Sequence, residues 1–163
     1  MNTIIKGDEL MLFDANGESI ALATSHTLSI SADAAQINCK DGGIWQSSTV
    51  NQINWSIDTD NLYSVVEFDK LFTIMTARTP VDVYFGLKGQ TGTGDVDTDG
   101  VAPQSGDTQK VWTKATTGCY KGKAVLTSLN VNAASGDNAT FTASFQGVGA
   151  LVKETQTTET PVQ

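Results

Sequence analysis

The chain has 163 residues and a formal net charge of −8, with 10 Lys and Arg against 18 Asp and Glu. This balance argues against a high-affinity nucleic-acid binder, because phosphate contacts need clustered Lys and Arg. Hydrophobic residues make up 39% of the sequence, as in a globular domain, and no apolar run approaches the roughly 18 residues of a membrane helix. The N-terminal stretch MNTIIKGDEL lacks the apolar region of a secretory signal, so we expect none.

Most of the sequence alternates apolar and polar residues, which is the pattern of half-buried β-strands. In HTLSISA, for example, Leu28, Ile30 and Ala32 face one side, and Thr and Ser face the other. An Asn-Gly pair at 16–17 marks a hairpin turn. The strands predicted from this pattern are 9–13, 19–24, 26–32, 53–58, 81–88, 123–132 and 139–152.

Residues 64–79 have the spacing of a helix instead. Four apolar residues recur at i, i+3, i+4 and i+7, which places them on one helical face. Ser64 and Glu67 match a capping box at the start, and Pro80 ends the segment. We predict that this face packs on a sheet; its members are Phe68, Leu71, Phe72 and Met75.

These elements together predict a mainly β fold with one flanking helix. We expect a single domain over residues 1–153 and a polar tail over 154–163. Residues 89–118 are rich in Gly, Thr, Asp and Ser and predict a long loop. Loops of this length in compact domains are usually functional or disordered.

Residues that carry catalysis or bind metals are scarce. His26 is the only histidine, and Cys39 and Cys119 are the only cysteines. This removes most zinc sites and most pairs of a nucleophile with a histidine. We expect both thiols to be reduced, with a disulfide as the alternative. The sequence therefore predicts no catalytic residue, no cofactor and no enzymatic activity.

The stretch DVDTDG resembles the first half of an EF-hand calcium loop through Asp95, Asp97 and Asp99. An EF-hand also needs a bidentate Glu at position 12 and a helix on each side, and Gly106 occupies that position here. A calcium site at the three aspartates remains the weaker alternative. We favour a hydrated loop that contacts another subunit, with Val111 and Trp112 as its apolar anchor.

The polar sides of the predicted strands carry Thr and Ser rather than Lys and Glu, as in HTLSISA and ATFTASF. Soluble monomers usually protect exposed strands with charged side chains. Uncharged, β-prone faces suit packing against other subunits. The alternative is a two-sheet sandwich whose outer face happens to be rich in Thr and Ser.

Four segments occur in an order that resembles the major tail proteins, or tail tube proteins, of long-tailed bacteriophages. The family pattern begins with G-x-x-L-x-L-F, continues through I-A-x-A-T-S-x-x-L-S-I-S-A-D and K-D-x-G-x-W, and ends with W-S-I-x-x-x-x-L. The matching segments here are 7–13, 20–33, 40–45 and 55–62. The resemblance covers about the first 90 residues in order and, more weakly, the closing hairpin.

The resemblance implies a β-sandwich or barrel-type tail tube fold with one flanking helix, in a virion protein made in the host cytoplasm. Six copies would form a ring whose inner strands join into a continuous β-barrel, and stacked rings would form the channel for genome ejection. The implied partners are further copies of the chain, tape measure and tail terminator proteins, and passing DNA, with no membrane. A negative lumen would let DNA slide, because it repels phosphate. The competing hypothesis is a calcium-dependent β-sandwich binding or adhesion module.

Overall fold

The computed structural model describes residues 4–20, 22–37, 45–89 and 112–154. A short 3-10 turn at Gly7–Glu9 opens the described part. The elements that follow it are β1 (Leu10–Phe13), β2 (Leu22–Ile37), β3 (Ser47–Leu62), α1 (Val65–Ala77), β4 (Val81–Lys88), β5 (Lys114–Asn132) and β6 (Thr140–Lys153). The predicted mainly β fold with one flanking helix is confirmed. Among the described residues, no helix is long and apolar enough to cross a bilayer.

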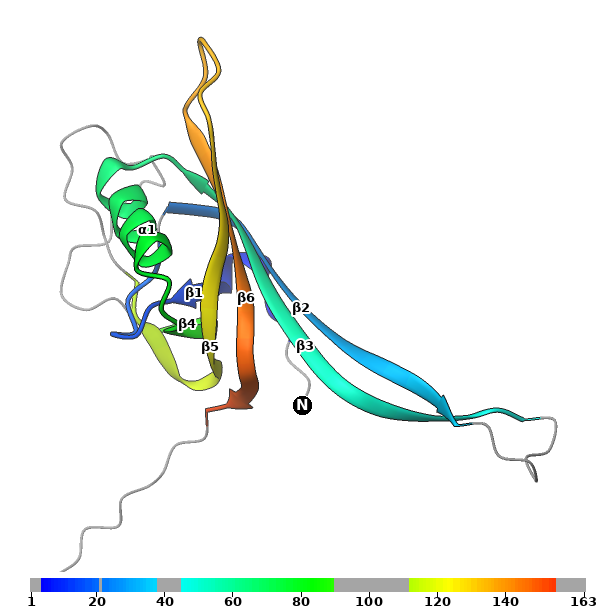
Figure 1. Cartoon of the computed structure of the whole chain (residues 1–163). Helices are drawn as coiled ribbons and strands as arrows, with labels where there is room; N and C mark the ends of the chain where they lie inside the picture. Colours follow the sequence, from blue (N-terminus) through cyan, green and yellow to red (C-terminus); the bar gives the residue numbers. More distant parts are fainter. Residues whose placement is uncertain (1–3, 21, 38–44, 90–111, 155–163) are drawn as a thin grey trace, which may run out of the picture.

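All six strands belong to one antiparallel sheet in the order β1-β4-β5-β6-β3-β2. The sheet curls, so that β1 and β4 cross behind the long strands β5, β6 and β3, and α1 lies against one side (Figure 1). β2 and β3 continue past the rest of the sheet as a two-stranded arm (Figure 1). We define the arm as residues 30–37 of β2 with 47–54 of β3, where β3 has no partner other than β2.

Two sequence-based boundaries need correction. The segments predicted as separate strands at 19–24 and 26–32 are largely one strand, β2, which runs on to Ile37. The loop predicted at 89–118 ends earlier, because β5 begins at Lys114. The first residues of β5 alternate only weakly between apolar and polar side chains. They nevertheless pair with β4, and Cys119 among them is completely buried. This part of the strand was not predicted because its residues are mostly small or polar and lack a clear apolar–polar alternation.

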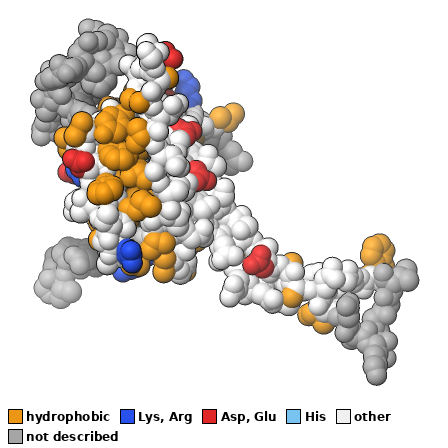
Figure 2. All heavy atoms as spheres, turned by 45° about the horizontal axis from the view of Figure 1, so that its top comes forward, with side chains coloured by type: hydrophobic (Ala, Val, Ile, Leu, Met, Phe, Trp, Pro, Cys, Tyr) orange, Lys and Arg blue, Asp and Glu red, His pale blue; other side chains and the backbone are white. Residues whose placement is uncertain are grey.

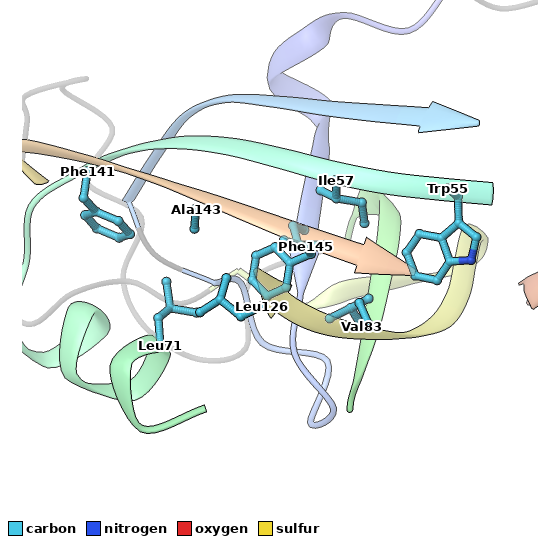
Figure 3. Packing of buried hydrophobic residues seen from close by; sticks show 10 residues of the cluster. Trp55, Ile57, Leu71, Val83, Leu126, Phe141, Ala143 and Phe145 are labelled. Carbon is cyan, nitrogen blue, oxygen red and sulfur yellow. The ribbon is translucent and has the colours of Figure 1, made fainter. Parts of the chain in front are cut away.

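The core lies between the two halves of the curled sheet and under α1. In Figure 3, side chains of β3 and β6 point toward those of β4, β5 and α1. Leu71 from the helix meets this cluster together with Leu126 of β5. The buried members of the cluster are Leu12, Trp55, Ile57, Leu71, Val83, Ala124, Leu126, Phe141, Ala143 and Phe145.

The helix packs through a face that includes only half of the predicted one, namely Phe68 and Leu71. Leu71 is 2% exposed, and Phe68 and Ile74 pack against the core. Phe72 is 54% exposed and Met75 36%, so their assignment to the core face was wrong. Apolar residues cover two adjoining faces of this helix, and their period alone does not decide which face meets the sheet.

Trp55 occupies a slot built by glycines. Its indole lies directly on the backbone of β5 and β6, where a Cβ added at Gly122 or Gly147 would overlap the ring. The indole Nε1 donates a hydrogen bond to the carbonyl oxygen of Gly149 at 2.9 Å. Gly149 has a φ of 76°, a conformation that glycine adopts without steric cost. The absence of a Cβ at Gly122 and Gly147 thus allows the indole of Trp55 to lie against the backbone of β5 and β6.

Candidate functional site

The outer face of the long strands is a polar surface opposite the core. The register aligns three rows of residues across β2, β3, β6 and β5. Each row alternates along its strands with buried residues such as Ile57 and Phe145. We call this surface the polar face; its members are Ser25, Thr27, Ser29, Ser56, Asp58, Asp60, Thr142, Ser144, Gln146, Val125, Ser128 and Asn130.

The polar face carries two carboxylates and no Lys or Arg in its three rows. Hydroxyls on the neighbouring strands hold both acids in place. Ser144 Oγ donates a hydrogen bond to Asp58 Oδ1 at 2.6 Å, and Ser25 Oγ donates one to Asp60 Oδ2 at 2.8 Å. The carboxylates are therefore oriented across the strands by neutral partners. Their negative charge is not neutralised within the rows of the polar face.

The strands that carry the polar face end in two unpaired edges. β2 is the last strand of the sheet, so in the described part of the chain its outer edge has no partner strand. β5 pairs with β4 only as far as the pair Val81 and Ala124, so 125–132 of β5 pairs with no described strand on the side away from β6. β2 holds one formal charge in 16 residues, Asp33. Long edges with so little charge are normally avoided in monomers.

His26 lies on β2, opposite the buried Thr59 of β3. Both ring nitrogens are buried, and neither has a hydrogen-bond partner among the described residues. Burial lowers the pKa of His26 to about 4, and the nearby Asp60 carboxylate offsets only part of this. The ring is therefore neutral at pH 7.

The residues predicted to form a subunit-contact loop are only partly described. Asp95, Asp97, Asp99 and Val111 lie outside the described residues, so both roles considered for them remain predictions. Trp112 is described, and it is tied to its own chain. Its N–H donates to Ser19 Oγ at 3.2 Å, its carbonyl oxygen accepts from the Ser19 N–H at 2.8 Å, and Lys88 Nζ lies 4.6 Å from the ring centroid. Within the described ranges, His, Cys, Asp and Glu form no metal-binding group of three or more.

Similarity to known proteins is found in three dimensions rather than in sequence. No family model matches the chain, and no curated protein does so either. A chain in the tail of an empty gene transfer agent particle, refined with C6 symmetry, superposes with a TM-score of 0.67. At 14% identity, the match covers 92% of this chain and 98% of that one.

The chain has the fold of a tail protein. A chain in the virion of the native gene transfer agent particle gives the same values, a TM-score of 0.67 and 14% identity over 92% of this chain and 98% of that one. The six-fold symmetrised baseplate of the anti-feeding prophage gives a TM-score of 0.53 and 10% identity, over 96% of this chain and 100% of that one. The resemblance noted from the sequence is thus confirmed at the level of the fold.

Sequence reasoning recognised Thr- and Ser-rich strand faces, but it missed the polar face as one surface. The alternation within HTLSISA and ATFTASF is visible in the sequence, but it does not join these two segments to each other or to Asp58 and Asp60. What joins these residues is the pairing of β3 with both β2 and β6. Alternation gives the side of a strand, whereas register and strand order depend on contacts between distant segments.

Proposed function

We propose that the chain is the tail tube subunit of a phage or phage-like tail. In this proposal six copies form a ring, and stacked rings form the channel through which the genome leaves the particle. The observation that carries it is the four-stranded unit β5-β6-β3-β2, which has an unpaired edge on each side and an outer face whose three shared rows hold two carboxylates and no Lys or Arg. The fold shared with a chain of a C6-symmetric tail supports the same assembly.

The two edges suit each other in direction. Because each strand of the unit is antiparallel to the next, β2 runs opposite to β5. The outer edge of β2 therefore meets residues 125–132 of β5 in the next copy as an antiparallel pair. Six such junctions close a barrel of four strands per copy. Closure removes the exposed edges, which are otherwise prone to aggregation.

The polar face would line the channel. Asp58 and Asp60 repel DNA phosphate, and the surrounding hydroxyls and amides carry no charge that would hold DNA. The opposite face of these strands is filled by the hydrophobic core, so the polar face is the side of the barrel left for the lumen. In a complete tail, the tube ends would contact tape measure and tail terminator proteins.

Electron microscopy of the concentrated protein tests the assembly. We expect rings with six-fold symmetry and hollow rods; monomers at every concentration and salt condition would refute the proposal. The lumen assignment has its own test in the variant Asp58→Lys. Tubes of this variant should retain short DNA at low salt, whereas wild-type tubes should release it. Asp8→Lys makes the same charge change on the exposed 3-10 turn at Gly7–Glu9 and should behave as wild type.

A further inference from the structure

The arm has an apolar row that nothing in the described chain covers. Ile30, Ala32 and Ala34 alternate along β2, and the register places Ile53 and Val50 beside the last two. The three large members of this set are 57–65% exposed: Ile30 60%, Ile53 65% and Val50 57%. A two-stranded ribbon is marginally stable alone in water, so this row needs a partner surface.

A second apolar surface, which the described residues leave exposed, lies on α1. Val65, Phe72 and Met75 form a stripe on the face beside Phe68, and Val65 is 62% exposed. Figure 2 shows hydrophobic side chains gathered on the body of the domain, on the side where Figure 1 places α1, and others on the projecting arm. Patches of this kind in a folded protein usually mark sites of interaction.

We propose that the apolar row of the arm docks on the α1 stripe of a second copy of the chain. The arm projects away from the side that carries its own α1 (Figure 1), so the two surfaces do not meet within one copy. Two different, complementary patches on one chain produce a head-to-tail contact, which builds rings or stacks rather than closed dimers.

Length and orientation fit this pairing. The stripe from Val65 to Met75 spans about 15 Å at 1.5 Å per helical residue. The row from Ile30 to Ala34 spans about 13 Å at roughly 3.3 Å per strand residue. The row continues the core side of the sheet through Leu28 and Trp55, and α1 packs on that same side. The contact therefore leaves the polar face free.

Aspartate substitutions at neighbouring positions test whether the apolar side of the arm and the apolar side of α1 are the ones that make the contact. Val50→Asp and Phe72→Asp should each raise the critical concentration for assembly at least about tenfold, because each would bury an unpaired carboxylate. Their matched controls, Thr49→Asp and Thr73→Asp, place the same charge one residue away on exposed positions and should change it less than about twofold. If Val50→Asp or Phe72→Asp assembles like its control, the proposal is refuted.

Cross-linking tests the contact directly and does not require tubes. Val50→Cys protein is mixed with Phe72→Cys protein under mild oxidation, and peptide mass spectrometry identifies the joined peptides. We expect a disulfide between position 50 of one copy and position 72 of another. Replacing Val50→Cys with Thr49→Cys should reduce its yield at least about fivefold, because side chains alternate between strand faces. A disulfide only between two copies of Val50→Cys would show arm against arm and overturn the proposal.

The docking contact rests on the proposed self-assembly of the chain, but different results would refute the docking contact and the tail tube proposal. Wild-type rings without a 50–72 cross-link would refute the docking contact and leave the tail tube proposal intact. A 50–72 cross-link between copies that never form rings would refute the tube and retain the contact.

Discussion

The slot that holds Trp55 gives a quantitative test of the packing between β3 and the β5–β6 pair. Trp55→Ala should lower the free energy of unfolding by about 3–5 kcal/mol, because the indole is only 3% exposed and leaves a cavity. Gly147→Ala should cost about 1–3 kcal/mol, because the new methyl group overlaps the indole. Once the indole is gone, the methyl group has room, and the cost of Gly147→Ala should fall close to zero.

The double mutant therefore measures the contact. We expect a coupling free energy of about 1–3 kcal/mol between the two substitutions. Urea unfolding followed by far-ultraviolet circular dichroism, at a concentration where light scattering shows monomers, would report it. Gly7→Ala serves as the control, since a Cβ there meets nothing within 4 Å. Additivity of the two losses within about 0.5 kcal/mol would refute the proposed steric conflict.

Three further predictions concern stability; urea unfolding tests the first two, and a thermal melt tests the third. Leu71→Ala should cost about 2–5 kcal/mol, whereas the exposed Phe72→Ala should cost less than about 1 kcal/mol in the monomer; equal losses would contradict the observed helix face. His26 is neutral when folded, with its pKa lowered to about 4 from 6.5, so the unfolded chain binds its proton more readily. Stability should thus fall from pH 6.5 to pH 4, by at most about 3 kcal/mol, relative to His26→Gln; parallel pH profiles would exclude this. Calcium and a chelator should give the same melting temperature if the 95–99 acids stay hydrated; a calcium-dependent rise would revive the metal alternative.

Local pattern was sufficient for the strands whose two faces differ clearly in polarity. β4 has the predicted bounds, and Leu28, Ile30 and Ala32 share one side of β2 as alternation indicated. The first half of β5 was missed because small and polar residues fill both of its faces there. Its place in the sheet comes from pairing with β4, which is a contact between distant segments.

The helix shows a second limit of the sequence. Its position follows from local signals, but Phe72 and Ile74 compete for the core face, and both are apolar. Only the sheet decides between them, through the side chains that surround Leu71. The same limit applies to the polar face, because the sequence supplies acids and hydroxyls without stating which strands lie side by side. An apolar side chain that is exposed in a single copy but would contact a neighbouring copy in an assembly adds a further difficulty, because the sequence does not distinguish it from a core residue.

The even number of strands in the β5-β6-β3-β2 unit constrains how such a protein can change during evolution. With four alternating strands, the first and last run in opposite directions, so copies joined edge to edge as proposed would pair in the same antiparallel geometry that is found inside each copy. One extra strand would make every junction parallel and every register wrong at once. The bore of a tube built this way can therefore widen by insertion of a whole hairpin, or by recruitment of another copy, but not by a single strand.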